Sequence, residues 1–330
     1  MRKFFVFAAI AAVCGVAVSC SDDENAEEPG GGNNGSSTPV VPEISPSDFG
    51  GVRLMSVIDS YGYGTDFSYD ANNLIKKITD GSSAVTFDFS KGTATFSESG
   101  FEQVANITNT KSGLITSVQV SDVDYEESEQ FTEDIKWDFQ YDSGDHLVKA
   151  SYVYRCKNAA GREVKSETVT VTFTWNGNLL SSSNLVGVEN YETGDVDNWS
   201  KSVTFEYDDA LTNRYMQYTG GMISAIDLDG DVESCMFVGL LGRGSSQLPS
   251  KIIAVSSSNH REEEEYNYTI GSNGLIEVES ATTVAEYGTY SWSNTYIYSD
   301  THNPQSKVLK APKADKKHRF FRRAEHTRKF

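Results

Sequence analysis

The chain has 330 residues and a formal net charge of -19, with 47 Asp and Glu against 28 Lys and Arg. A body this acidic excludes nucleic acid as a main partner, because binding phosphate backbones requires a basic surface. Without the N-terminal segments described next, roughly 280 residues remain, enough for one large all-β domain or two small ones. We expect a single domain over residues 49–304, since no Pro/Gly/Ser-rich linker divides this part of the sequence.

The N-terminus has the layout of an export signal. Arg2 and Lys3 precede an apolar run over residues 4–18, and a basic start before a short apolar stretch is typical of signal peptides. The run is shorter than the about 20 apolar residues that a membrane-spanning helix needs. Residues 1–19 are therefore predicted to be a signal peptide that is removed.

Ala17, Val18 and Ser19 lead directly into Cys20, and this stretch resembles a lipobox. The resemblance implies cleavage before the cysteine and diacylation of its sulfur, so that Cys20 becomes the mature N-terminus. The alternative is ordinary secretion with Cys20 discarded or unmodified. Cys20 is thus the lipidation site that the sequence predicts.

Residues 20–48 are rich in Gly, Asn, Ser, Pro and acid, with almost no apolar residue before Val40. Such a segment buries too little surface to order itself, which predicts a disordered tether. The cluster Asp22, Asp23 and Glu24 resembles the surface-export signal of lipoproteins that Gram-negative lineages display outside the cell. It favours an outward-facing protein at the outer membrane, and the alternatives are a solvated acidic linker and a periplasm-facing protein.

One motif returns along the body of the chain. It is "FSYDANNLIKKI" from Phe67, and related stretches are "FQYDSGDHLVKA" from Phe139, "FTWNGNLLSSS" from Phe173, "FEYDDALTNRY" from Phe205 and "YTIGSNGLIEV" from Tyr268. In the first copy, Phe67 and Tyr69 are two residues apart and share one face of a strand. Asp70 can then accept a hydrogen bond from the backbone two residues on, and the asparagines that follow tolerate left-handed turns. The motif predicts a hairpin whose return strand carries a bulge.

The aromatic residues of the motif recur at a regular interval. Tyr141, Trp175 and Tyr207 are 34 and 32 residues apart, and Tyr69 lies 72 residues before Tyr141, about two further periods. A period in this range signals stacked supersecondary units, here a hairpin with its connector. We predict that these four rings are core anchors of the fold and not an exposed row of ligand platforms.

Most segments between the motifs alternate apolar and polar residues, as "TVTVTFTW" does, which is the habit of antiparallel sheets with one buried face. A series of hairpins forms a meander that must roll up or cover its edges. The predicted fold is therefore all-β: an antiparallel meander rolled into a barrel-like or porin-like sheet. The irregular segment over residues 233–250 is expected to form one short helix or a loop that plugs the rolled sheet, with Gly242 to Ser246 as a loop.

The "F-x-Y-D" turns, the lipoprotein start and "GLLGRGSSQLPSKI" resemble an uncharacterised family of surface lipoproteins, a domain of unknown function described as having a porin-like β-fold. The resemblance covers roughly residues 49–304. The turns also resemble the Tyr-Asp repeats of RHS proteins. The family implies a fold and a location, and no reaction that could be transferred to residues of this chain.

The last segment, residues 305–330, holds ten Lys and Arg against Asp315 and Glu325. We expect a disordered basic tail. The alternative is a basic arm that touches anionic headgroups or lipopolysaccharide phosphates, with Phe320 and Phe321 as apolar contacts.

A search for reaction chemistry yields no catalytic, cofactor-binding or metal-binding motif. His146, His260 and His302 include no pair with metal-ligand spacing, and neither H-E-x-x-H nor G-x-S-x-G occurs. The run from His260 to Glu265 is predicted to be a charged strand edge.

Three acidic residues, Asp227, Asp229 and Asp231, raise the question of calcium. Val232 occupies the place where an EF-hand loop needs Gly, and Asp229 with Gly230 predicts a tight hairpin instead. Calcium binding there stays open. Cys156 and Cys235 also stay open, because an exported protein permits a disulfide but both lie in apolar, strand-like surroundings that suit buried thiols.

Seven aromatic residues in turn-rich or alternating segments are candidates for glycan contact: Tyr191, Trp199, Tyr215, Tyr218, Tyr287, Tyr290 and Trp292. Aromatic residues are also favoured in strands simply because they pack there. We expect a surface-anchored lipoprotein that is a non-catalytic binding module of the cell envelope, with a glycan or protein partner. The alternatives are a structural envelope component without a small ligand and a glycoside hydrolase whose carboxylates come from distant strands.

Overall fold

The computed structural model describes residues 39–43, 45, 49–98, 101–126, 129–228, 230–285 and 288–299. The predicted signal peptide, Cys20, nearly all of the tether and the basic tail lie outside these residues. Among the described helices, none is long and apolar enough to cross a membrane.

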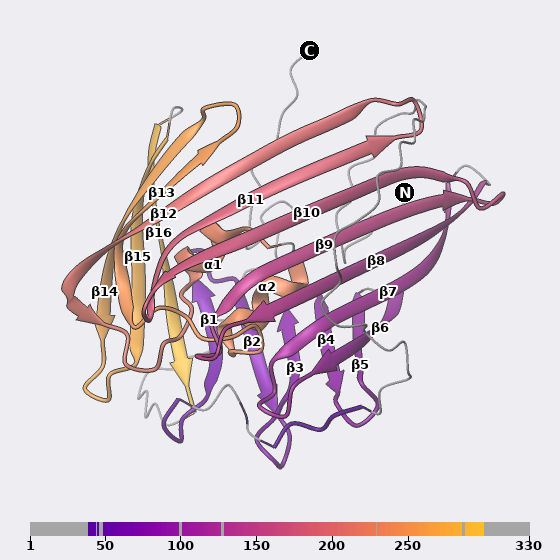
Figure 1. Cartoon of the computed structure of the whole chain (residues 1–330). Helices are drawn as coiled ribbons and strands as arrows, with labels where there is room; N and C mark the ends of the chain where they lie inside the picture. Colours follow the sequence, from indigo (N-terminus) through magenta and orange to yellow (C-terminus); the bar gives the residue numbers. More distant parts are fainter. Residues whose placement is uncertain are drawn as a thin grey trace.

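Antiparallel strands form a single closed barrel in the described part of the chain (Figure 1). Each strand pairs with the next, and β1 pairs with β16 to close the sheet. The strands are β1 (Leu54–Asp59), β2 (Gly64–Tyr69), β3 (Ile75–Asp80), β4 (Ser83–Asp88), β5 (Thr93–Glu98), β6 (Phe101–Asn109), β7 (Ile115–Glu126), β8 (Glu129–Tyr141), β9 (Leu147–Asn158), β10 (Glu163–Asn176), β11 (Leu179–Tyr191), β12 (Val196–Thr212), β13 (Gln247–Ser256), β14 (Arg261–Ile270), β15 (Ile276–Ala285) and β16 (Gly288–Tyr298). The predicted all-β meander that rolls into a barrel is confirmed.

The barrel has two distinct ends. The turns that follow even-numbered strands form one end, which we call the repeat end because it carries the Tyr-Asp motifs. The turns that follow odd-numbered strands form the other, the far end. Strands β1 to β5 have six residues each, whereas β7 to β12 have 12 to 17. One side of the wall is therefore much taller, as Figure 1 shows.

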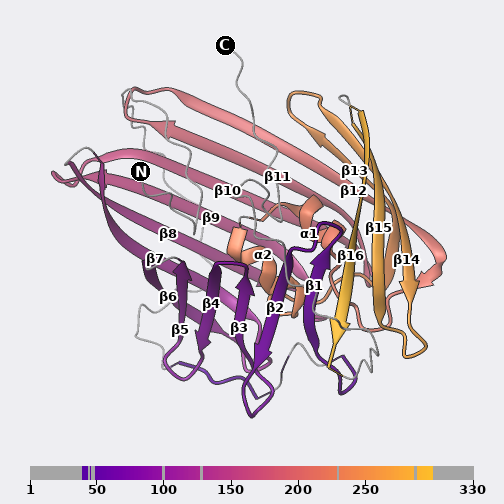
Figure 2. The same cartoon turned by 180° about the vertical axis from the view of Figure 1, so that it is seen from behind.

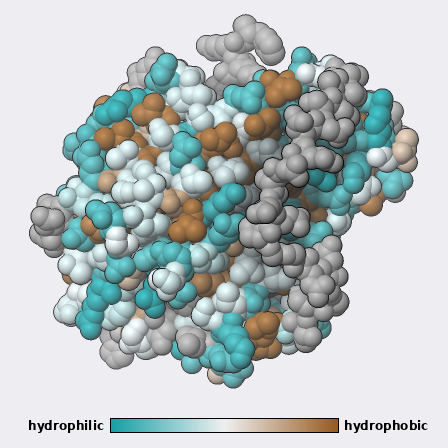
Figure 3. All heavy atoms as spheres, in the orientation of Figure 1, coloured by the Kyte–Doolittle hydropathy of each residue, from teal (hydrophilic) through white to brown (hydrophobic). Residues whose placement is uncertain are grey.

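Alternation along the strands places apolar side chains inside the barrel and polar ones outside. On β8, Ile135, Trp137 and Phe139 are buried, whereas Lys136 and Gln140 between and beyond them are exposed. In Figure 3, hydrophilic and neutral residues predominate on the visible outer face and the hydrophobic ones are scattered. Transmembrane barrels have the opposite pattern, with an apolar outer band around a polar interior.

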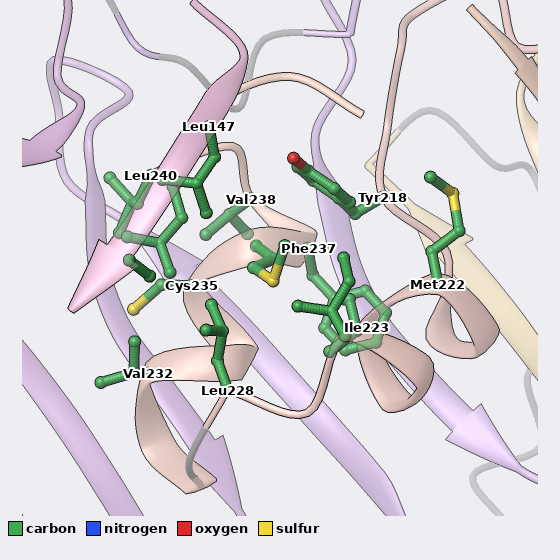
Figure 4. Close-up of a cluster of buried hydrophobic side chains, with 14 of the residues drawn as sticks. Leu147, Tyr218, Met222, Ile223, Leu228, Val232, Cys235, Phe237, Val238 and Leu240 are labelled. Atoms are coloured by element: carbon green, nitrogen blue, oxygen red, sulfur yellow. The ribbon is translucent and has the colours of Figure 1, made fainter. Parts of the chain in front are cut away.

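Two short helices, α1 (Gly220–Ile226) and α2 (Gly230–Phe237), lie inside the barrel (Figures 1 and 2). They come from the connection between β12 and β13 and fill the lumen toward the repeat end. Phe237 of α2 packs edge-on against Phe67 of β2 and Tyr296 of β16, with ring centres 6.1 and 6.4 Å away. Figure 4 shows the cluster that the helices form with the wall, including Leu147, Tyr218, Met222, Ile223, Leu228, Val232, Cys235, Val238 and Leu240.

The plug is confirmed but differs from the prediction in two details. It consists of two helices that begin at Gly220, before the expected 233–250, and strand β13 already starts at Gln247. The predicted hairpin at Asp229 and Gly230 is wrong, because helices flank this position. Thr219 caps α1 by accepting from the Met222 N–H over 3.3 Å, and Asp227 ends it in the left-handed conformation at φ 61°. These local caps override the Asp-Gly turn signal.

The repeated motif builds turns at the repeat end as predicted, except in the copy from Phe205. There the predicted hairpin is wrong, because β12 continues to Thr212 and leads into the two helices. The Asp70 carboxylate accepts from the N–H groups of Asn72 (2.8 Å) and Leu74 (2.9 Å), and Asn73 adopts φ 67°. Pairing shifts by one residue between Ser68 and Tyr69, which places the expected bulge in the return strand β3. Asp142 repeats the arrangement with the N–H groups of Gly144 and His146.

Candidate functional site

The inner wall changes character along the tall strands. On β10, Val169, Val171 and Phe173 are buried toward the repeat end. Lys165 lies four residues before Val169 on the same strand, so its side chain also faces the lumen, but nearer the far end. Charged and aromatic residues thus replace the apolar core on the inner wall above the helices.

Lys165 is the centre of one group of inner-wall side chains, which we call the Lys165 cluster: Glu133, Tyr154, Lys165, Glu189 and Tyr191. The ammonium of Lys165 lies 2.5 Å from the Glu189 carboxylate, and both side chains are mostly covered, with 13% and 16% exposed. It also lies 5.9 Å from the ring centre of Tyr154 and 5.6 Å from that of Tyr191, within cation–π range. The cluster holds one cation, two carboxylates and two aromatic rings within one small area.

Tyr154 is the deepest member of this cluster. Its hydroxyl donates to a Glu133 carboxylate oxygen over 2.6 Å. Burial, together with the neighbouring Glu133 charge, raises the pKa of Tyr154 far above its ordinary value. The phenol therefore remains a hydrogen-bond donor throughout the physiological range and fixes the carboxylate of Glu133 at the wall.

Trp199 of β12 continues the surface beside the Lys165 cluster. It pairs across the strands with Gly187 of β11, and a Cβ at Gly187 would lie only 2.1 Å from the Trp199 ring. The indole therefore packs flat over a position where only glycine fits. Trp199 remains partly exposed, so its ring is available on the inner wall.

A second group, the Glu264 cluster, lies on β14 to β16: Glu264, Tyr266, Thr283, Tyr290 and Trp292. Glu264 accepts from Thr283 Oγ1 (2.6 Å), from Trp292 Nε1 (3.2 Å) and from the Tyr266 hydroxyl. Tyr290 pairs directly opposite Thr283 and is 53% exposed. The carboxylate thus orders two aromatic rings beneath an exposed third ring.

Glu279 lies on the same side of the wall and is fully buried against α1. It accepts from the Tyr296 hydroxyl (2.7 Å), from Asn294 Nδ2 (3.4 Å) and from the Gly221 N–H at the start of α1 (3.2 Å). Burial raises the pKa of Glu279 even though these hydrogen bonds oppose the shift. This carboxyl group fixes the plug to the wall.

The arrangement suits binding better than acid–base catalysis. A general acid or base needs reach to a substrate, but Glu264 is occupied by three donors and Glu279 is enclosed beneath α1. Within the described residues, no group of three or more His, Cys, Asp or Glu side chains is placed to hold a metal ion. What the inner wall presents is partly exposed rings beside ordered hydrogen-bonding groups.

The structure separates the aromatic candidates of the sequence into two kinds. Tyr191, Trp199, Tyr290 and Trp292 lie on the inner wall, whereas Tyr218 is buried in the core and Tyr215 packs edge-on against Phe49 at 6.4 Å. Tyr287 lies outside the described residues. Sequence reasoning missed Lys165 and Glu189, and it considered Glu264 only as part of a charged run. The available signal was their position, an even number of residues from buried residues on the same strand.

The other sequence candidates lie away from this surface or outside the described residues. Asp227 caps α1 and lies 3.1 Å from the Lys201 ammonium, while Asp229 and the side chain of Asp231 are not described. Cys156 and Cys235 are two buried thiols and not a disulfide. The run from His260 to Glu265 falls largely on strand β14, but the predicted strand edge is wrong, because β14 pairs with both β13 and β15. Glu264 within the run faces inward.

Comparison with solved structures supports the fold. A porin-like protein from Bacteroides uniformis aligns with a TM-score of 0.50 and 13% sequence identity, over 79% of this chain and 99% of that one. A porin-like protein from Bacteroides vulgatus aligns with a TM-score of 0.49 and 14% identity, over 73% of this chain and 97% of that one. No protein-family model matches the chain, and no curated protein matches its sequence. The similarity is one of fold, an all-β porin-like barrel.

Proposed function

We propose that this protein is a lipid-anchored component of the outer membrane, exposed at the cell surface, whose barrel binds a glycan on the inner wall near the far end. The observation that carries the proposal is the change along the tall strands from buried apolar side chains to partly exposed aromatic and charged ones. A barrel that served only as a filled structural shell would gain by continuing its apolar core there.

The chemistry of the inner wall favours a ligand rich in hydroxyl groups. Lys165 donates and Glu189 accepts side by side, so both can bind hydroxyls, which act as donors and acceptors. The faces of aromatic rings carry partial negative charge and attract the polarised C–H groups of a sugar ring. Trp199 and Tyr290 offer such faces at their partly exposed positions.

A pore is the less favoured function for this barrel. The helices and their apolar contacts fill the lumen toward the repeat end, and the outer face visible in Figure 3 does not show the apolar band of a transmembrane wall. Lipid at Cys20 is then the attachment that the proposal requires, since a diacylated cysteine supplies two chains for stable anchoring.

The proposed anchor also orients the barrel. Asn109 Nδ2 donates to the Val40 carbonyl over 2.9 Å, and the Glu43 N–H donates to the Lys111 carbonyl over 2.8 Å. The chain that follows Cys20 in sequence thus enters the barrel beside the β6–β7 turn, at the repeat end. In our proposal this end faces the membrane and the far end faces away from it.

The anchor is tested with Cys20→Ala in the native host. The variant should leave the membrane fraction and appear in the soluble extract, whereas Cys156→Ala should remain with the membrane. Normal pelleting of Cys20→Ala would reject the lipid anchor. Replacing Asp22, Asp23 and Glu24 with Ala should reduce digestion by external protease, and unchanged digestion would reject their part in export.

Binding is tested by screening the mature protein against a glycan array and measuring affinity for the best glycan. Tyr191→Ala and Trp199→Ala should each lower affinity at least tenfold without loss of the folded barrel. Asn190→Ala is the matched control, because Asn190 precedes Tyr191 on β11 and its side chain therefore lies on the outer face of the barrel. Equal affinity in Tyr191→Ala and Asn190→Ala would show that the glycan binds elsewhere. If the protein bound a protein partner and no glycan, the glycan proposal would be rejected.

A further inference from the structure

A cavity of about 60 Å³ lies in the lumen between strands β4 to β7 and the plug. Inward side chains of β4 to β7 form one side, and Val232 and Cys235 of α2 form the other. These two residues are three positions apart and lie on the same side of the helix, as Figure 4 shows. The cavity is partly open and nearly all of its lining is apolar.

Small side chains create this space. Ala94 of β5 and Ala105 of β6 are direct cross-strand partners, and both line the cavity. On the helix, Val232 and Cys235 are also short. Short side chains therefore line the cavity from both the wall and the helix, and larger ones at these positions would fill it. A void in a close-packed interior loses the dispersion contacts that filling atoms would make.

One polar group of the lining has an unmet hydrogen-bonding need. Gln103 Nε2 donates to Asp122 Oδ2 over 2.9 Å, which fixes the orientation of the amide. Gln103 Oε1 is buried and accepts no hydrogen bond within the described residues. Leaving a buried acceptor unpaired costs about 1–3 kcal/mol, so a donor at this point would be favourable.

We propose that this cavity binds the end of a linear, uncharged apolar chain that carries a hydroxyl group. The apolar lining receives the chain, and Gln103 Oε1 accepts from the hydroxyl. A ring is disfavoured, because the cavity is well below the roughly 150 Å³ that admits benzene. A fatty carboxylate is disfavoured because Asp122 lies beside the amide.

The site is independent of the proposed glycan surface. It lies on β4 to β7 and α2, whereas the Lys165 and Glu264 clusters lie on β8 to β11 and on β14 to β16. Binding here can therefore succeed or fail whatever the outcome on the glycan array.

The test uses 1-hexanol as the probe, with hexanoate and hexane as comparisons, and the mature full-length protein. Methyl resonances of Val232 and Ile107 should shift with 1-hexanol, and its affinity should exceed that of hexanoate at least tenfold. Ala105→Leu should abolish the shifts by filling the cavity. Val104→Leu is the matched control, because Val104 lies on the outer face of the same strand and is 55% exposed.

Two further variants keep the result decisive if Ala105→Leu does not fold. Ala94→Val is a smaller filling and should lower 1-hexanol affinity at least threefold. Gln103→Leu should remove the preference for 1-hexanol over hexane. The proposal is overturned if no methyl shift occurs up to the solubility limit, if hexanoate binds as well as 1-hexanol, or if the filled variants bind unchanged.

Discussion

The hydroxyl of Tyr207, in the later part of β12, donates to the backbone carbonyl of Leu180 near the start of β11 over 2.6 Å. The same bond recurs at the other motif aromatics, from Tyr69 to Leu54 (2.8 Å), from Tyr141 to Ile115 (2.5 Å), from Trp175 to Leu147 (2.9 Å) and from Tyr268 to Pro249 (3.1 Å). Each of these side chains joins the later part of one strand to the first residues of the strand before it. The motif therefore closes the open end of these five strand pairs, opposite the turn that connects them.

Tyr207→Phe tests this role of the hydroxyl. Burial raises the pKa of Tyr207 to about 12, so the group is a donor at any working pH. Its loss should lower the free energy of unfolding by about 1 kcal/mol, and Tyr207→Ala by about 3–5 kcal/mol through the lost ring. Urea unfolding followed by circular dichroism measures both. Tyr61→Phe, at a 71% exposed position, should have little effect; equal losses in both Phe variants would contradict the role of the bond.

Asp142→Asn tests the turn carboxylate. Burial alone would raise the pKa of Asp142, but hydrogen bonds from His146 and Gly144 outweigh it and hold the pKa below the ordinary 3.8. The charged form therefore adds stability that is fully present above pH 3.8 and is lost as pH falls through the lower folded-state pKa. The stability difference between the wild type and Asp142→Asn should shrink on acidification. A constant difference between pH 7 and pH 2 would reject this assignment.

Glu279→Gln should show the opposite dependence on pH. Burial raises the folded-state pKa of Glu279 above its ordinary 4.5. The protonated form favours the folded protein, and this contribution is lost as pH rises from 4.5 through the raised pKa. The stability of the wild type relative to Glu279→Gln should therefore fall between acidic and neutral pH. Thermal melts of both proteins across this range measure it, and a rising difference would contradict the raised pKa.

Gly187→Ala tests the packing of Trp199. The new methyl group would overlap the indole, so the ring must move, which should cost about 1–3 kcal/mol and shift the tryptophan emission. Gly64→Ala is the matched control, since its Cβ would meet Ile58 at an ordinary 3.4 Å. If our proposed glycan site is right, only Gly187→Ala also weakens glycan binding. Identical emission and stability in the two variants would show that Trp199 does not depend on Gly187.

The strands and their turns were predictable because their signals are local. Alternation marks the inner face of each strand, and Asp70 and Asp142 carry the turn chemistry within four residues of the groups they bond. Tyr69, Tyr141, Trp175 and Tyr207 are packed against the core as predicted, although each is partly and not fully buried. Their polar atoms bond carbonyls 15 to 28 residues away, which no local pattern reveals.

The sequence pointed to the aromatic residues of the inner wall but not to its charged ones. Trp199 and Tyr290 attract attention as aromatic residues, whereas Lys165 and Glu264 look like the solvated charges that any strand carries. Their inward direction follows from register, and their meeting depends on which strands are neighbours in the closed barrel. Helix α1 was missed because its first turn relies on a distant carboxylate, that of Glu279, to accept from Gly221.

The pairing of β1 with β16 also determines when the barrel can close during folding. The Arg53 N–H donates to Ser299 Oγ across 246 positions of sequence, and closing so long a loop is slow compared with forming neighbouring hairpins. Every other strand pair can form as the chain is synthesised, but the pairing of β1 with β16 must wait for the last strand. Until β16 has been synthesised, β1 and β15 are unpaired edge strands that can pair with another molecule. A protein lacking β16 would therefore fail by aggregating during folding rather than by losing a ligand.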